Sequence, residues 1–225
     1  ENYLTGVKWL FILCDYCVEA FSHPILKLLI RGIARIKQHF PKQAVAMSDD
    51  LLLRIHDCLD FSVCNDVAFW ALLLIGFNLM ARKSNLAPKS GAAFDPARQL
   101  LRQDVSQGSD FIVVAIRWSK TNQFGGRVLT VPLFAARSAL CPVRAYDNLI
   151  ACTPGSEQDP LFVWRKNRKW VPIAYPDYLC RLRELVAQAG LNAEEYSTHS
   201  IRRRGATTAH AAGLSRSLIA AVGDW

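Results

Sequence analysis

The sequence contains no apolar run long enough to cross a membrane as a helix. Its longest apolar run covers residues 67–80 and carries Asn78 near its end, whereas a spanning helix needs roughly 20 apolar residues. No secretory segment, internal repeat or low-complexity tract is visible either. We therefore expect no membrane association, and we expect residues 67–80 to form a buried core helix.

The sequence also lacks a metal-binding pattern of cysteines and histidines. Cys14 and Cys17 have the spacing of a ligand pair, but no second pair follows at ligand spacing. Dispersed cysteines in odd number, mostly within apolar helical patterns, predict reduced and buried thiols in an intracellular compartment, which would be the nucleus in a eukaryote. The seven cysteines are Cys14, Cys17, Cys58, Cys64, Cys141, Cys152 and Cys180. We expect no metal and no cofactor.

Acidic residues are few, with 19 Asp and Glu against 27 Lys and Arg, which gives a net charge of +8. This balance favours a polyanionic partner but does not separate DNA from RNA or an acidic membrane. Basic residues gather at 165–169 and at 202–204. The first cluster fits either a solvated hairpin tip or a contact with backbone phosphates. For the second cluster we expect phosphate contact.

Helical patterns fill the first part of the chain. Residues 3–21 and 24–39 read as amphipathic helices, and the basic face of the second could lie along DNA. Residues 40–44 break this pattern, and Ser48 offers an N-cap for the next helix. We place a domain boundary there, which separates residues 1–42 from residues 48–225.

The rest of the chain mixes strand and helix patterns. Three β-prone segments separated by turn signals predict a small antiparallel sheet; they cover residues 100–105, 110–118 and 127–133. A short hairpin is possible at residues 161–172. Helices are expected at residues 142–151, 176–188, 200–212 and 215–222. The predicted fold class is mainly α with a small three-stranded antiparallel sheet, an α+β architecture.

Two residues of one predicted helix suit phosphate chemistry. His199 and Arg202 lie three positions apart, so one helical turn brings both side chains to the same side. A guanidinium can hold two phosphate oxygens while an imidazole takes or holds a proton. The simpler interpretation is the basic start of a solvated helix.

Three further residues join this pair in a fixed order along the chain. Arg82 follows the apolar run, where it could merely complement the helix dipole. Lys120 stands where the second strand runs out, and it could be an ordinary loop lysine. Trp225 closes the sequence and could be a core aromatic.

This ordered set resembles the catalytic domain of the tyrosine recombinases, the phage-integrase superfamily. The sequence RKSNL at residues 82–86 is most similar to the recombinases of eukaryotic mobile elements. The resemblance covers residues 48–225, and residues 1–42 resemble the last part of the family's helical core-binding domain, which clamps DNA. The family's fold and chemistry are therefore expectations for this chain.

The resemblance implies cleavage and rejoining of double-stranded DNA through a 3′-phosphotyrosine, without a metal, by a homotetramer on two duplexes. Arg82 and Arg202 would hold the phosphate, and Lys120 would protonate the departing 5′ oxygen. His199 would assist proton transfer, and Trp225 would donate its indole N–H to a phosphate oxygen. No small-molecule substrate is implied.

Two departures from the family leave alternatives open. Asn85 stands where many members carry an acidic residue. The family's nucleophilic tyrosine follows the position of Trp225, whereas all six tyrosines of this sequence precede His199. Because the sequence begins with Glu1 and stops at Trp225, we expect both ends to be cut and the catalytic domain to be incomplete and inactive alone.

Two functions of different class remain. One is a DNA strand-exchange enzyme, and the other is a non-catalytic DNA-binding remnant of a mobile-element recombinase. A type IB topoisomerase shares the chemistry but resembles these motifs less.

Overall fold

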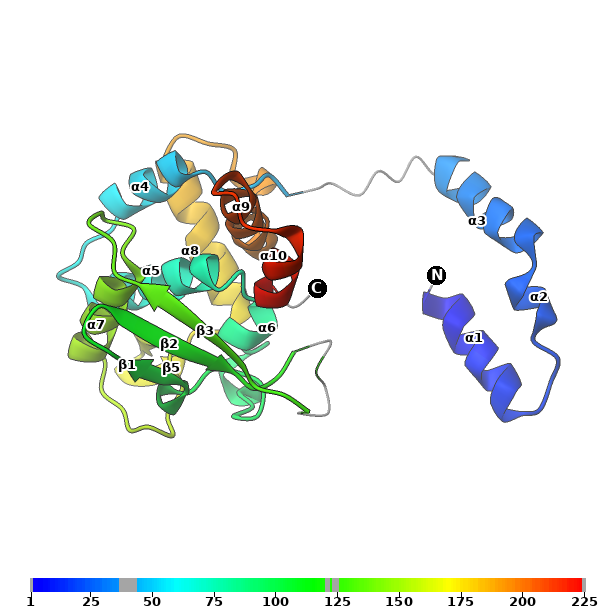
Figure 1. Cartoon of the computed structure of the whole chain (residues 1–225), viewed down its shortest axis with the longest axis horizontal. Coiled ribbons are helices and arrows are strands. Elements are labelled where there is room, and N and C mark those ends of the chain that lie inside the picture. The colour runs from blue at the N-terminus through cyan, green and yellow to red at the C-terminus, as the bar shows by residue number, and fades with distance from the viewer. Residues whose placement is uncertain (1, 37–43, 120–121, 123–125, 224–225) are drawn as a thin grey trace. The chain divides into compact units, whose positions relative to one another are not determined.

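The computed structural model describes residues 2–36, 44–119, 122 and 126–223. The chain divides into two compact units, Glu1–Gln43 and Ala44–Trp225 (Figure 1). Each unit is described by itself.

Residues 2–36 of the first unit form the helices α1 (Asn2–Leu13), α2 (Glu19–Ser22) and α3 (Pro24–Ile36). The prediction of one continuous helix over residues 3–21 is wrong, because α1 ends in a left-handed turn at Asp15, whose φ is 57°. There the Tyr16 N–H donates to the Phe11 carbonyl at 2.8 Å, a bond that closes a helix C-terminus. A short aspartate tolerates the left-handed conformation.

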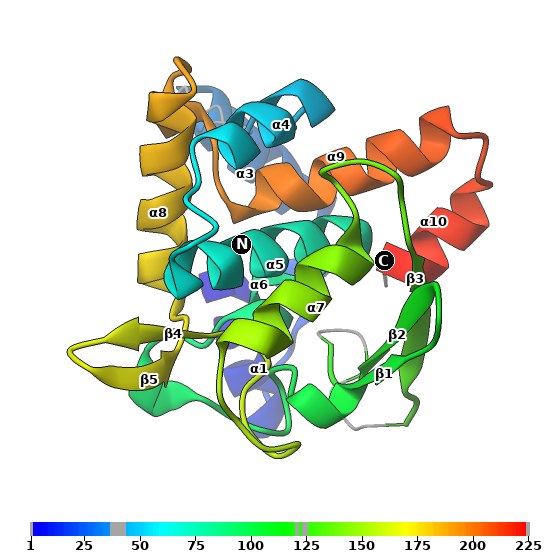
Figure 2. The ribbon, with the colours of Figure 1, turned by 90° about the vertical axis from the view of Figure 1, so that its left-hand side faces the viewer.

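The second unit is built around α5 (Cys64–Asn78), which lies in its middle (Figure 2). Every side chain from Val67 to Phe77 is buried, so the predicted core helix is confirmed. Helices α7 (Pro142–Cys152) and α9 (Thr198–Ala211) pack against α5. The unit's remaining helices are α4 (Asp49–Asp57), α6 (Lys83–Leu86), α8 (Tyr175–Gln188) and α10 (Arg216–Gly223), with 3₁₀ turns at η1 (Gly91–Ala93), η2 (Arg102–Asp104) and η3 (Ala193–Glu195).

A three-stranded antiparallel sheet, β1 (Val105–Gln107), β2 (Phe111–Ile116) and β3 (Leu129–Phe134), lies beside α7 in the order β1-β2-β3. Its central strand alternates in burial, with Ile112, Val114 and Ile116 directed to the core. The fold class predicted from the sequence, mainly α with a small antiparallel sheet, is confirmed. A second sheet pairs β4 (Val163–Lys166) with β5 (Lys169–Pro172).

The first strand begins five residues later than predicted. Residues 102–104 form the turn η2 instead, because the Asp104 carboxylate accepts the Leu101 N–H at 2.8 Å and bends the backbone. Leu101 itself makes an isolated bridge to Pro160. A hydrogen bond from a polar side chain thus replaces the first part of the strand that was predicted over residues 100–105.

The cysteines are less buried than predicted. Cys141 is buried, whereas Cys14, Cys17 and Cys180 are exposed and the other three are intermediate. Burial raises the pKa of Cys152 to about 11. No group of three potential metal ligands occurs in the part of the chain that the structure describes. Within that same part, no helix has both the length and the apolar character to span a membrane.

Candidate active site

The segment that carries Arg82 begins where α5 ends. Met80 adopts the left-handed conformation with φ of 47°, and the Ala81 N–H closes the helix by donating to the Gly76 carbonyl at 3.0 Å. The backbone is then extended at Arg82, which is the N-cap residue of α6. Arg82 therefore lies beyond the end of α5, outside the helix itself.

The start of α9 fixes the second part of the site. The Ser197 hydroxyl accepts the His199 N–H at 3.2 Å, and the Ser197 N–H donates to the Ser200 hydroxyl at 3.0 Å. These two bonds cap the helix. They also set the direction in which the side chains of His199 and Arg202 leave the first two turns.

Arg202 joins three elements. Its guanidinium donates to the Met80 carbonyl after α5, and to the Gly223 carbonyl of α10 at 2.5 Å. The helices approach closely here because Gly205 has no side chain: a Cβ at this position would lie 2.6 Å from the Phe77 carbonyl oxygen. The glycine thus lets α9 bring Arg202 next to the Arg82 segment.

Arg82, His199 and Arg202 line one cavity of about 440 Å³. Its other lining residues are Ala81, Lys83, Ser84, Trp118 and Thr198. A smaller cavity of about 20 Å³ is also lined by both Arg82 and Arg202. Arg82 and Arg202 therefore lie next to each other on one side of the second unit.

Lys120 and Trp225 lie outside the described residues. Ser119 and Asn122, the nearest described residues on either side of Lys120, line the smaller cavity, as does Gly223. The chain around both positions therefore reaches the site.

The arginine cluster at residues 202–204 does not act as one patch. Arg203 donates to the Ala44 carbonyl at 2.6 Å, and Arg204 pairs with Asp49 at 3.3 Å. Because consecutive helical residues point about 100° apart, only Arg202 lines the cavity. The expected phosphate contact is retained for Arg202 alone.

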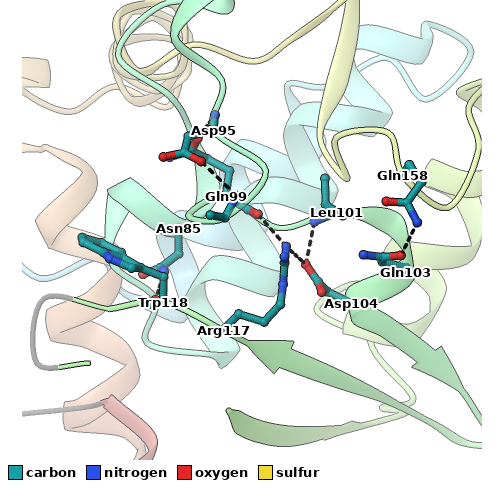
Figure 3. A network of polar contacts seen from close by, with 10 residues as sticks. Asn85, Asp95, Gln99, Leu101, Gln103, Asp104, Arg117, Trp118 and Gln158 are labelled. Carbon is teal, nitrogen blue, oxygen red and sulfur yellow. Dashed lines mark hydrogen bonds and ion pairs between the residues drawn. The ribbon is translucent and has the colours of Figure 1, made fainter. Parts of the chain in front are cut away.

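Asn85 links the Arg82 segment to the residues that follow β2. Its side chain is only 3% exposed, and its amide donates to the Trp118 carbonyl at 2.6 Å (Figure 3). Here a neutral amide holds the Arg82 segment against the end of β2, where many members of the resembled family carry a charge.

Lys83 belongs to the site although the sequence did not single it out. Its ammonium lies 3.9 Å from the centre of the Tyr175 ring, and it lines the same cavity as His199. Partial burial lowers the pKa of His199, and the charges of Lys83 and Arg202 lower it further. In the sequence, the only sign that Lys83 belongs to the site was its position next to Arg82.

The basic cluster at residues 165–169 covers the end of β4, the two-residue turn at 167–168 and the start of β5. Asn167 and Arg168 both have positive φ, 50° and 64°, as a two-residue hairpin turn requires. Lys166 pairs with Asp177 at 3.1 Å. The tip is thus well formed, and both interpretations of its charge, solvation or phosphate contact, stay predictions.

Known structures share this arrangement of elements. No protein-family model and no curated protein matches the chain. A structure of the XerH site-specific recombinase bound to difH substrate matches with a TM-score of 0.58 and 16% identity, covering 83% of this chain and 47% of that chain. The fold of the chain is like that of a tyrosine recombinase catalytic domain. An FLP recombinase–Holliday junction complex matches with a TM-score of 0.51 and 13% identity, covering 78% of this chain and 42% of that one.

The chain therefore spans about half the length of these recombinases. At such identities the likeness shows the recombinase fold alone. The chemistry of the site rests on its own residues.

We expect the affinity for DNA to depend on the charge of His199. The pKa of His199 lies below the usual 6.5. The ring is therefore neutral at pH 7 and becomes charged only as the pH falls through this lowered pKa. A few-fold gain in duplex affinity is expected on acidification from pH 7 to pH 5, because His199 then adds one more positive charge to the cavity that Arg82 and Arg202 line. Fluorescence anisotropy at constant salt measures it.

The matched control is His199→Asn, which keeps the other four histidines. The acid-induced gain of the wild type should exceed that of this variant. Equal pH dependence in the two proteins would mean that His199 does not face the bound phosphate.

Proposed function

We propose that the protein cleaves and rejoins DNA strands as a tyrosine recombinase of a mobile element, in integration or a related exchange. One observation carries the proposal. Arg82 and Arg202, 120 positions apart in the sequence (202 minus 82), line one cavity together with His199. The recombinase fold of the second unit supports it.

The chemistry of this cavity suits a phosphodiester. In the transition state of phosphoryl transfer, charge spreads over the non-bridging oxygens. Fixed donors aimed at those oxygens lower the barrier without reorganisation. In this proposal Arg82 and Arg202 supply the donors, and Arg202 is already held in place by the Met80 and Gly223 carbonyls.

Proton transfer requires further groups. A neutral His199, favoured by its lowered pKa, can accept the proton of the attacking hydroxyl. Lys120 would protonate the departing 5′ oxygen, and Trp225 would donate its indole N–H to a phosphate oxygen. Their neighbours Ser119, Asn122 and Gly223 line the smaller cavity, which supports placing them here.

The proposed partner is double-stranded DNA, bound by a homotetramer on two duplexes inside the cell, in the nucleus of a eukaryote. Residues 1–42 would form part of a DNA clamp. The net charge of +8 supports a polyanionic partner. The XerH and FLP structures contain their substrate or a Holliday junction, which favours DNA over the other polyanions.

A covalent-trapping experiment tests the enzyme. The protein, expressed from its natural gene, is incubated with a nicked duplex from which the cleaved strand diffuses away, and the products are resolved in denaturing detergent. A protein–DNA adduct is expected, and it should disappear in Arg82→Ala and in Arg202→Ala, because neither variant stabilises the developing charge. Residues 1–225, whose tyrosines all precede His199, should give no adduct.

The second candidate, a non-catalytic DNA-binding remnant, is favoured by that order of tyrosines. It predicts duplex binding by the full-length protein with no covalent adduct. An adduct on residues 1–225 would instead show that one of the six tyrosines of this sequence is the nucleophile.

A further inference from the structure

A second cavity of about 310 Å³ adjoins the proposed phosphate site. The two cavities share Lys83, Ser84 and Trp118 as lining residues. A ligand held by Arg82 and Arg202 can therefore extend into the second cavity. Its volume lies at the lower end of the range for small-ligand pockets.

Two aromatic rings form walls of this cavity, each with a cation beside it. Tyr175, the first residue of α8, has the Lys83 ammonium 3.9 Å from its ring centre. Trp118, which follows β2, has the Arg98 guanidinium 5.1 Å from its ring centre. Lys83 and Arg98 are both exposed, so these long side chains can move aside for a flat ligand.

The charges of the lining favour an anion. The lining contains three basic residues, Lys83, Lys89 and Arg98, and one acidic residue, Asp95, whose carboxylate pairs with Arg98 at 3.1 Å. The lining thus carries two more positive than negative charges. A ligand with both an aromatic ring and a phosphate would match the rings and the cations together.

The walls are held by hydrogen bonds of the fold. The Trp118 carbonyl accepts from Asn85, and the Tyr175 N–H donates to the Pro88 carbonyl at 2.8 Å. Gln99 links the third wall, because it donates to the Ser84 carbonyl and accepts the Asp95 N–H, both at 2.8 Å (Figure 3). The cavity is therefore formed before a ligand arrives, which lowers the cost of binding.

We propose that this second cavity binds one unpaired nucleotide of a DNA strand, next to the phosphate held by Arg82 and Arg202. The inference rests on the proposed function, because a strand that is exchanged must leave its complement before it is rejoined. Unpaired bases stack on aromatic side chains while nearby cations contact the backbone. Trp118 and Tyr175 would stack the base, and Lys83, Lys89 and Arg98 would hold its phosphates.

Fluorescence anisotropy on the full chain tests the proposal with three labelled probes of equal phosphate count. The probes are an oligothymidine strand, an abasic strand and a blunt duplex. Tyr175→Ala and Trp118→Ala should each weaken oligothymidine binding about tenfold, because stacking on a ring is lost. Binding of the abasic strand and of the duplex should change less than about twofold in Tyr175→Ala, because Tyr175 lines the second cavity but not the cavity that Arg82, His199 and Arg202 line.

Phe134→Ala is the matched control, because Phe134 is a 66% exposed aromatic on β3 and is absent from the lining of this cavity. It should leave all three affinities unchanged. Tyr175→Phe keeps the ring and should bind oligothymidine like the wild type. If the alanine variants do not fold, Tyr175→Leu replaces them as the variant without a ring, and Tyr175→Phe remains its control.

Two outcomes overturn the proposal. One is an equal loss on all three probes, which would make the cavity a general backbone contact, and the other is no loss on oligothymidine. The experiment also separates failure of the proposed phosphate site. In that case Arg202→Ala would leave the affinities for all three probes unchanged, while the aromatic variants would still bind oligothymidine more weakly.

Discussion

Replacing Asp104 with alanine should lower the free energy of unfolding by about 3 kcal/mol. The Asp104 side chain is 5% exposed and accepts from the Leu101 N–H at 2.8 Å and from the Arg117 guanidinium at 2.7 Å. Removing one partner of a buried ion pair typically costs 3–5 kcal/mol. We expect the lower end because the Arg117 side chain is 31% exposed. Urea denaturation, read as a shift in midpoint at constant slope, measures the change.

Asp57→Ala is the matched control, because the Asp57 side chain is 80% exposed and its ion pair with His56 lies at the surface. It should change the free energy of unfolding by less than about 0.5 kcal/mol. The double variant Asp104→Leu with Arg117→Met should recover part of the loss, since no buried charge remains unpaired. A single variant Asp104→Ala as stable as the wild type would contradict this account.

The Asp104–Arg117 pair also bears on function. Arg117 precedes Trp118 at the end of β2, and it donates to the Gln99 carbonyl at 3.3 Å (Figure 3). Gln99 in turn holds the backbone at Ser84, two residues after Arg82. One network therefore ties the Arg82 segment to the strand that leads to Lys120.

The parts of the fold that the sequence predicted are those with a strong periodic signal. Residues 67–77 are apolar throughout because this part of α5 is buried on all sides. Residues of the central strand alternate because one face is buried. In both cases tertiary burial and sequence pattern have the same cause.

The errors arose where one polar or unusual backbone contact decides the structure. Met80 and Asp15 end helices in the left-handed conformation, which glycine usually provides. Asp104 bends a segment that has strand-like composition. A sequence pattern averages over many residues and does not contain such single contacts.

The candidate site divides in the same way. His199 and Arg202 could be paired from their spacing, because one helix carries both. Lys83 could not be identified, since its role depends on Tyr175, 92 positions away (175 minus 83). The divergence of Arg203 and Arg204 follows from helix geometry alone and could have been predicted.

Replacing Arg202 with alanine should weaken duplex binding at least tenfold, because a charge-assisted bond to phosphate is lost. The salt dependence of binding should also become shallower by roughly one counterion. Fluorescence anisotropy across a salt series measures both. Lys169→Ala is the matched control: it removes one positive charge at the start of β5, where Lys169 is exposed, and should change the affinity less than about twofold.

Arg202 also supports the fold, since it donates to the carbonyls of Met80 and Gly223. Thermal unfolding of each variant separates this role from binding. Arg202→Lys keeps the charge but not the planar fork that reaches two carbonyls and a phosphate at once. It should therefore retain the salt slope of the wild type and lose affinity. If Arg202→Ala remains folded and binds duplex DNA no worse than Lys169→Ala, then the cavity that Arg202 shares with Arg82 and His199 does not hold the phosphate.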